Sequence, residues 1–128
     1  HVYTAQDTTT FVQTVLEAWY RQQARSVFGE RFGCVSQKAA WAKDHEVTLK
    51  LRRMKRTWGN CSSSGVIKLN THLIKAPIPI IDSVIAHELC HLCEMNHGRA
   101  FYALLQGLNP DWKRHRKILV AQGNTYLQ

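Results

Sequence analysis

The chain has 128 residues, of which 45% are hydrophobic and 20% are charged. These values are ordinary for a single globular domain; they exclude two separate cores and, because no run of about 18 apolar residues occurs, a membrane-spanning helix. The 17 Lys and Arg residues against 9 Asp and Glu residues give a formal charge of +8, which indicates either a solvated basic surface or an anionic partner or substrate.

The first predicted element is an amphipathic helix over residues 8–28. Apolar side chains recur there at spacings of three and four residues, which is the period of one helix face. We expect Trp19 to lie in the core, Tyr20 at its boundary, and Gly29 to end the helix. Residues 30–43 fit either a short helix or a loop. The apolar positions are Phe11, Val12, Val15, Leu16, Trp19, Tyr20 and Val27.

Two strands are predicted in the middle of the chain. Residues 45–54 alternate apolar and polar side chains, which is the pattern of a half-exposed strand. Residues 57–65 have the Gly, Ser and Asn content of a loop, and residues 66–70 form the second strand. We expect these strands to pair as an antiparallel hairpin with a long connection.

Three helices are predicted after the strands. The first starts at the prolines of residues 77–79 and continues along an apolar stripe through Leu92. We expect it to end at Gly98 in the left-handed conformation. A helix over residues 98–107 and another over residues 111–122 follow. The basic face of the last helix holds Lys113, Arg114, Arg116 and Lys117.

The central motif is His87-Glu88-Leu89-Cys90-His91. Side chains at i and i+4 leave the same face of a helix, so His87 and His91 are placed to hold one tetrahedral Zn²⁺. Glu88 is offset by about 100° from His87, where it can accept a proton from a metal-activated water without being a ligand. The motif predicts a zinc hydrolase site; the alternative is two surface histidines beside a helical glutamate.

A catalytic zinc site needs a third protein ligand, and the candidate we favour is His97. If the helix ends before it, its imidazole can fold back toward the pair. Glu94 shares the face of the two histidines but lies about 10 Å along the axis from His87, which favours a supporting or surface role. Cys90 and Cys93 are rotated off that face, so we expect buried small apolar side chains. The other candidates, without a predicted ligand role, are His45, His72 and His115.

With these residues assembled, the chain resembles the YgjP-like metal-dependent hydrolases, a zincin-like family related to the SprT-like metallopeptidases. Two departures stand in the loop: Thr57 occupies the place where the family usually has Arg, with Arg56 one position earlier, and Asn60 the place where it usually has Ser. The matching stretches are residues 53–62, 65–70 and 84–92, Asn96-His97 and Phe101-Tyr102.

The resemblance implies that His87, His91 and His97 hold the metal and that Glu88 is the catalytic carboxylate. It also implies an α+β, zincin-like fold, with a small antiparallel sheet packed beside the HExxH helix and with flanking helices. Family members commonly carry an additional N-terminal region. We therefore expect residues 1–128 to be one zincin-like catalytic domain, the C-terminal part of a longer protein.

The function expected from these residues is zinc-dependent hydrolysis, with a metallopeptidase as the first hypothesis. Glu88 would act as general base on a metal-activated water, and Tyr102 and His115 are candidate donors to the developing oxyanion. An extended peptide substrate would pair with the strand of residues 45–54 or that of residues 66–70.

Two alternatives use a basic cluster near the predicted site. One is a metal-dependent phosphoanhydride or nucleotide hydrolase, whose substrate phosphates the cluster would neutralise. The other is a nucleic-acid-associated zinc protein, in which Trp58 would stack on a base. A solvated strand face is the third interpretation of the same residues. The cluster consists of Arg52, Arg53, Lys55, Arg56 and Lys68.

Cysteine spacing and the N-terminal sequence bear on the compartment. The four cysteines lack the spacing of a disulfide framework, and no signal-peptide pattern opens the chain. We therefore expect reduced thiols in a cytoplasmic protein that acts on a peptide or another anionic substrate, without a membrane partner.

Overall fold

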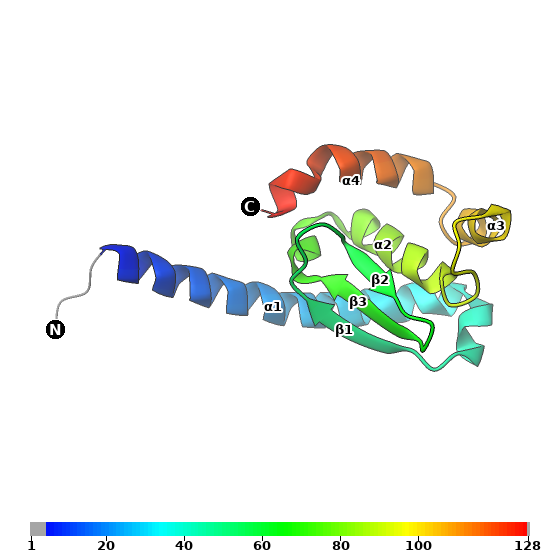
Figure 1. Ribbon diagram of the computed structural model, residues 1–128, viewed down its shortest axis with the longest axis horizontal. Helices are drawn as coiled ribbons and strands as arrows, with labels where there is room; N and C mark the ends of the chain where they lie inside the picture. The colour runs from blue at the N-terminus through cyan, green and yellow to red at the C-terminus, as the bar shows by residue number, and fades with distance from the viewer. Residues whose placement is uncertain (1–4, 128) are drawn as a thin grey trace.

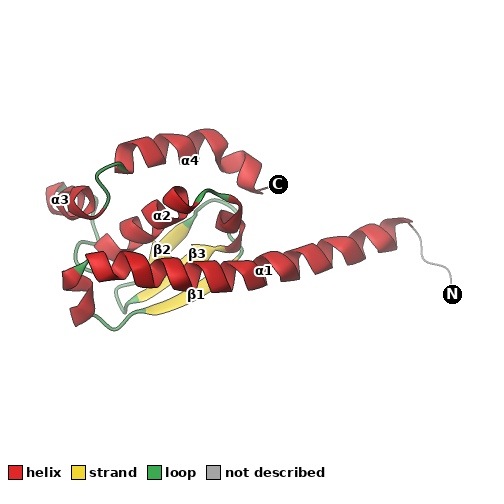
Figure 2. Cartoon of the chain, turned by 180° about the vertical axis from the view of Figure 1, so that it is seen from behind, coloured by secondary structure: helices red, strands yellow, loops and turns green. Residues whose placement is uncertain are grey.

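The computed structural model describes residues 5–127 and has the expected α+β architecture. Figure 1 shows the sheet in front of helices α1 and α2, and Figure 2 shows the same helices from behind, with α1 lying over the sheet. The helices therefore cover one face of the sheet. In chain order the elements are α1 (Ala5–Lys38), the 3₁₀-helix η1 (Ala40–Asp44), β1 (Thr48–Arg52), β2 (Gly59–Cys61), β3 (Val66–Asn70), the 3₁₀-helix η2 (Thr71–Lys75), α2 (Ile78–Cys90), α3 (Arg99–Leu108) and α4 (Trp112–Leu127).

The sheet is mixed, so the expected antiparallel hairpin was wrong. Its strand order is β1-β3-β2, with β1 parallel to β3 and β2 antiparallel to β3. The segment predicted as a loop over residues 57–65 contains β2. Because the connection between β1 and β3 is long enough to hold a strand and a return, it does not force the antiparallel pairing that a tight turn would.

Alternation along the strands divides the two faces of the sheet, as the pattern of residues 45–54 predicts. Ile67 and Leu69 of β3 are fully buried on the helix side, and Leu49 and Leu51 of β1 are half-buried there. The intervening Lys50 points the other way and is exposed. The hydrophobic core therefore lies between the sheet and helices α1 and α2.

Helix α1 is longer than predicted, and the part of its apolar stripe from Phe11 to Trp19 is not in the core, whereas Tyr20 is half-buried, as expected at the boundary. Gly29 lies in its interior, and the helix continues through Lys38. Trp19, expected in the core, is 52% exposed, and Phe11 is 69% exposed. At 100° per residue, the stripe from Phe11 to Trp19 faces roughly 170° away from Ala24, Phe28 and Val35, the buried residues of the second half. The first half of α1 also projects past the sheet (Figure 1).

The second half of α1 is held to α2 by an ion pair. The Arg31 guanidinium donates two hydrogen bonds to the Asp82 carboxylate, at 2.9 and 2.7 Å. The interaction raises the pKa of Arg31 above its usual value, because the charged form is stabilised by the hydrogen bond and the opposite charge. This pairing fixes α1 beside the helix that carries the HExxH motif.

The ends of α2 and α3 also differ from the prediction. Helix α2 ends at Cys90, earlier than expected, and Gly98 has φ −97° as the residue preceding α3. Among the described residues, the single positive φ is that of Gly65, 89°, in the turn before β3. Within residues 5–127, no helix combines the length and apolar character needed to cross a bilayer.

Candidate metal centre

Helix α2 places the motif because its apolar residues face the core and its motif residues face a cavity. Pro77 precedes the helix and Pro79 lies in its first turn, where a missing N–H is tolerated. Buried Ile81, Val84 and Ile85 anchor the helix against the rest of the core. This packing fixes the rotation of the helix, and with it the direction of His87 and Glu88.

His91 directly follows the last residue of α2 and caps the helix. It has α-helical dihedrals but closes the last turn, and it is 8% exposed. Its Nδ1 lies 2.9 Å from the backbone carbonyl oxygen of Glu94. Because a carbonyl only accepts, Nδ1 must carry the proton, and Nε2 is left with its lone pair free. Glu94 therefore supports His91 through its main chain, and the role predicted for its side chain stays a prediction.

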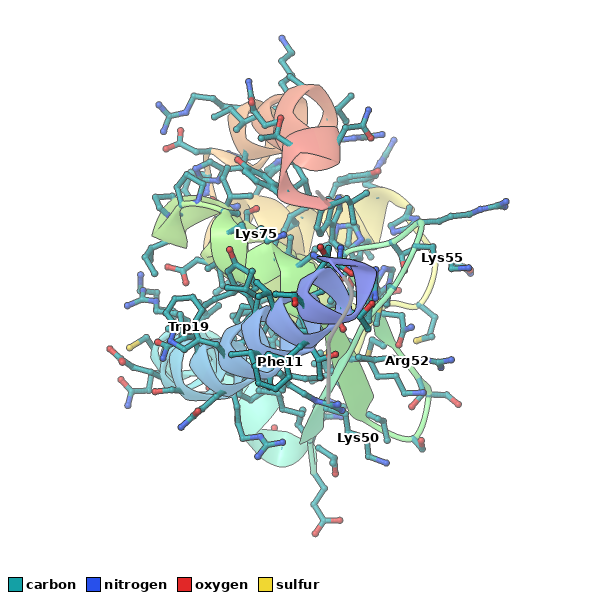
Figure 3. The ribbon with its side chains drawn as sticks, turned by 90° about the vertical axis from the view of Figure 1, so that its left-hand side faces the viewer. Phe11, Trp19, Lys50, Arg52, Lys55 and Lys75 are labelled. Atoms are coloured by element: carbon teal, nitrogen blue, oxygen red, sulfur yellow. The ribbon has the colours of Figure 1, made fainter. Side chains whose placement is uncertain are left out.

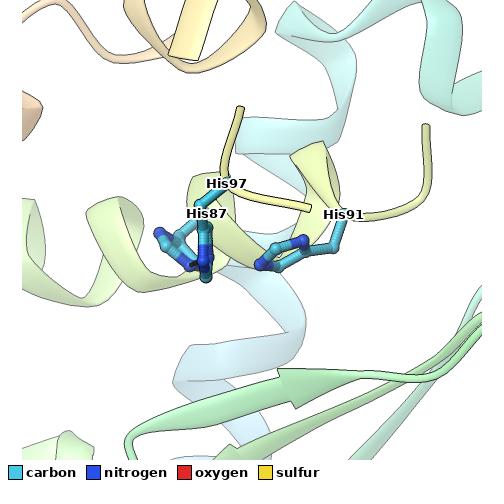
Figure 4. Close-up of side chains that lie close together, drawn as sticks. All are labelled: His87, His91 and His97. Carbon is cyan, nitrogen blue, oxygen red and sulfur yellow. Dashed lines mark hydrogen bonds between the residues drawn. The ribbon is translucent and has the colours of Figure 1, made fainter. Parts of the chain in front are cut away.

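His97 returns to the pair after the turn that follows α2. Its Nε2 lies 3.1 Å from Nε2 of His87, and ring nitrogens of His87, His91 and His97 all lie within 4.8 Å of one another. Figure 4 shows the three side chains gathered at the end of α2. In a tetrahedral zinc site with Zn–N bonds of 2.0–2.1 Å, ligand nitrogens are about 3.3 Å apart. The three imidazoles therefore fit a zinc ion in both chemistry and spacing.

Phe101 of α3 supports the three imidazoles from one side. Its ring stacks on His91, with centroids 4.6 Å apart, and lies edge-on to His87 and His97 at 4.9 and 4.8 Å. Burial and the neighbouring histidines lower the pKa of His87 to about 4, and burial lowers the pKa of His97. His87 and His97 are therefore held neutral near pH 7, which is the form that binds metals.

Glu88 lies beside this cluster in a restricted space. Its side chain is 6% exposed, and burial raises its pKa to about 7. Gly59 of β2 provides the room: a Cβ at Gly59 would lie 3.1 Å from both Cγ and Oε2 of Glu88. The carboxylate is thus confined between α2 and β2, with a pKa suited to exchanging a proton near neutral pH.

His87, Glu88 and His97 open into a cavity of about 350 Å³. Tyr102 and Trp112 form part of its wall, with their rings stacked 5.0 Å apart. Arg116 is the single Lys or Arg among the described residues that line the cavity, and its charge contributes to the lowered pKa of His87 and His97. The main lining residues are Trp58, Gly59, His87, Glu88, His97, Tyr102, Trp112, Arg116 and Leu119.

Sequence reasoning missed Arg116 and Gly59. In the sequence Arg116 is one of four basic residues on the last predicted helix, and nothing distinguishes it from Lys113, Arg114 or Lys117. Gly59 stands in the loop that carries the family resemblance, which was the available signal for its importance. Its contact with Glu88 depends on the pairing of β2 with β3, which the sequence did not predict.

The remaining candidate residues differ in whether they line the cavity and in how deeply they are buried. Tyr102 lines the cavity, but His115 does not; its Nδ1 lies 3.2 Å from the side-chain nitrogen of Asn109. Cys90 is fully buried as predicted, whereas Cys93 is exposed, with Sγ 3.7 Å from Nε2 of His45, because the helix ends before it.

The basic cluster is not part of the cavity wall. None of its five residues lines the cavity, although all of them lie in the described part of the chain. Arg53 points toward α1, where its guanidinium lies 2.9 Å from the Glu17 carboxylate. Arg52 and Lys68 lie on the face of the sheet that the helices leave uncovered. The cluster therefore forms a surface separate from the three histidines.

A three-histidine cluster beside a buried glutamate, in a cavity next to a small sheet, defines the class of metal-dependent hydrolases. The sequence agrees with this class: residues 1–122 match the family model described as YgjP-like, metallopeptidase domain. The chain therefore belongs to the YgjP-like metallopeptidase family, as its motifs predicted.

Two individual proteins resemble the chain over shorter or more distant matches. The UTP pyrophosphatase of Escherichia coli is 33% identical over 54 residues, which cover 42% of this chain and 32% of the relative. The matched region thus spans about a third of that relative. The crystal structure of the metallopeptidase zymogen of Pyrococcus abyssi abylysin matches with a TM-score of 0.56 at 21% identity, covering 68% of this chain and 93% of the other. The latter comparison shows that the two chains share a fold.

Proposed function

We propose that this protein is a zinc-dependent peptidase in which His87, His91 and His97 hold the metal and Glu88 is the general base. The observation that carries the proposal is the convergence of three ring nitrogens within 4.8 Å, beside a carboxylate that opens into the same cavity. Three nitrogen ligands leave one tetrahedral position for water or substrate, as catalytic zinc sites require.

The proposed mechanism assigns proton movement to Glu88. A zinc ion in this site would acidify water and polarise the substrate carbonyl. Glu88 takes a proton from the attacking water and delivers it to the leaving amine, and its pKa of about 7 suits both steps. Gly59 and the wall of α2 hold the carboxylate in place. The Tyr102 hydroxyl is the candidate donor to the developing oxyanion.

Strand β2 is the candidate support for an extended peptide. It lies at an edge of the sheet, and its Gly59 lines the cavity and lies against Glu88. Strand β3 is central and has both edges paired, and β1 lies on its other side. A peptide that pairs with residues 59–61 would bring a scissile bond to the three histidines.

A second candidate function is the hydrolysis of a phosphoanhydride in a nucleotide. The relative named UTP pyrophosphatase favours it, and Arg116 supplies one cation to the cavity wall. The aromatic rings of Trp58 and Trp112, which line the same cavity, suit the stacking of a base. The basic cluster does not contribute phosphate contacts there, which weakens this candidate relative to the peptidase.

The test measures the turnover of two substrate classes by the wild type and two variants. Peptides and nucleoside triphosphates are assayed with wild type, Glu88→Gln and Arg116→Gln, each with its metal content measured. Turnover of peptides that Glu88→Gln abolishes while retaining metal supports the peptidase. Turnover of triphosphates alone, weakened by Arg116→Gln, would replace it with the second candidate.

A further inference from the structure

The outer face of the sheet carries a concentration of positive charge. Residues of β1 and β3 that share a register position point to the same face, and Lys50 is paired with Lys68. Asn60 of β2 faces Lys68 from the other side. Two residues further along β1, Arg52 lies next to Asn70. Asn70 itself is buried, with its side chain donating to the carbonyl oxygens of Met54 and Thr57. The residues that share this face and keep some exposure are Thr48, Lys50, Arg52, Asn60, Val66 and Lys68, and none of them is acidic.

The pairing of Lys50 with Lys68 is unfavourable for the isolated fold. Like charges directly opposite each other on neighbouring strands destabilise a sheet. Within residues 5–127, neither lysine nor Arg52 forms an ion pair, and neither does Glu46, the acidic residue just before β1. A bound anion would relieve this repulsion, and anion binding would therefore explain why two lysines are paired here.

Within the described residues, this face of the sheet is not covered by a helix. No helix covers it in Figure 1, because α1 and α2 both lie behind the sheet. Lys55, in the loop after β1, extends the charge beyond the strand end. Figure 3 shows Lys50, Arg52 and Lys55 together on one side of α1, and Trp19 on the other. We call Lys50, Arg52 and Lys68 the basic sheet face.

We propose that the basic sheet face binds the phosphate backbone of a nucleic acid, an interaction that goes beyond the hydrolytic function proposed above. The charged side chains repeat about 4.8 Å apart between strands and about 6.7 Å apart along β1, a spacing that lets one polyanion contact several of them. No aromatic side chain lies on this face, so it has no platform for base stacking and contacts the backbone irrespective of sequence.

An anionic membrane is a weaker match to the same surface. Binding at a bilayer surface combines basic residues with exposed apolar side chains that insert between lipids. On this face the single large apolar residue is Val66, which is half-buried. The exposed large apolar residues, such as Phe11 and Trp19, lie on other surfaces. The charge without an insertable side chain therefore favours nucleic acid.

The location of the face makes the proposal independent of the metal centre. Gly59 and Cys61 of β2 point to the helix side, toward Glu88, whereas Asn60 points to the outer face. A nucleic acid on the outer face leaves the cavity open. Loss of DNA binding would therefore leave hydrolysis intact, and loss of hydrolysis in Glu88→Gln would leave DNA binding intact.

The test measures how salt affects DNA binding to the full chain. Fluorescence anisotropy with a duplex of about 20 base pairs is recorded between about 50 and 200 mM salt for wild type and the Lys50→Gln, Arg52→Gln, Lys68→Gln triple variant. The matched control is the triple variant Arg25→Gln, Lys113→Gln, Lys117→Gln, whose residues are exposed on α1 and α4. Both variants lower the charge of +8 by three.

The slope of log binding constant against log salt concentration should become shallower by about 2 to 3 in the first triple variant. In the control it should change by less than about 1. Oligo-dT of equal length should bind no more tightly than duplex. Equal weakening in both variants, no duplex binding at about 50 mM salt, or tighter binding to oligo-dT would overturn the proposal. Vesicle binding that depends on the same three residues, at matched salt and without duplex binding, would assign the face to a membrane instead.

Discussion

The two faces of the small sheet differ in what they contact, although the same strands form both. On the helix side, Ile67 and Leu69 are fully buried, and Gly59 leaves space for the Glu88 carboxylate. On the outer side, at the alternate strand positions, Lys50 is exposed and Lys68 is half-buried. The helix-side face therefore shapes the metal centre through packing, and the outer face acts through charge alone.

Because the two faces differ in burial, we expect tolerance to substitution to alternate along β3. Leu69→Ala removes a fully buried side chain, so we expect the free energy of unfolding to fall by about 2–5 kcal/mol. Lys68→Ala, the adjacent change on the outer face, should alter it by less than about 0.5 kcal/mol. Urea unfolding of both variants checks this. Comparable losses would show that the outer face is also packed.

When no metal is bound, the buried Glu88 carboxylate should lower the free energy of unfolding. Burial raises its pKa from 4.5 to about 7, so the folded chain favours the protonated acid, and the carboxylate costs about 3 kcal/mol above pH 7. We expect Glu88→Gln to stabilise the chelator-treated protein by up to that amount at pH 8. Below pH 4.5 the acid is protonated in both the folded and the unfolded chain, and the gain should vanish.

The check on that pH dependence is urea unfolding of wild type and Glu88→Gln at a series of pH values. Subtracting the two curves removes the contribution of the histidines, which both proteins share. A difference that does not change with pH would contradict the raised pKa of Glu88.

A substitution that adds one methyl group at Gly59 tests whether the space there positions Glu88. Gly59→Ala would place a Cβ 3.1 Å from Oε2 of Glu88 and 3.1 Å from the carbonyl oxygen of Lys68, so the carboxylate must move. We expect hydrolytic kcat to fall about tenfold or more, with metal content unchanged. Gly107→Ala is the control, because a Cβ at Gly107 meets nothing within 4 Å. Full activity in Gly59→Ala would show that this contact does not position Glu88.

The smallest expected effect lies at an exposed position of α1. Gly29 stands in the interior of this helix, and a Cβ there meets nothing within 4 Å. Gly29→Ala should therefore stabilise the protein by about 0.5–1 kcal/mol, opposite in sign to an ordinary core substitution. A lower thermal midpoint in this variant would indicate that the helix is not continuous through Gly29.

The sequence predicted the motif helix and the gathering of the three histidines well. Helical spacing places His87 and His91 on one face, and the end of the helix before His97 lets its side chain return to them. Both features depend on local geometry. The exact helix end was not predicted; just after it the His91 ring donates to the Glu94 carbonyl, a contact that helical spacing does not indicate. The family assignment came from motif order, and the family model agrees with it.

Features set by long-range contacts were predicted poorly. The alternation in β1 was right, but its parallel pairing with β3 depends on β2, a three-residue strand without a clear pattern. The stripe from Phe11 to Trp19 has the period of a core face, yet those side chains are exposed. Periodicity indicates which residues share a side of a helix; what covers that side depends on the rest of the fold.

The most direct test of the account is the metal content of the purified protein. After dialysis, elemental analysis should find about one zinc ion per wild-type chain, since three imidazole ligands form one site. His97→Ala should bind clearly less, whereas His72→Ala, a histidine in η2 outside the cluster, should retain the wild-type amount. Undiminished zinc in His97→Ala, or equal loss in both variants, would contradict the assignment of His87, His91 and His97 as the metal centre.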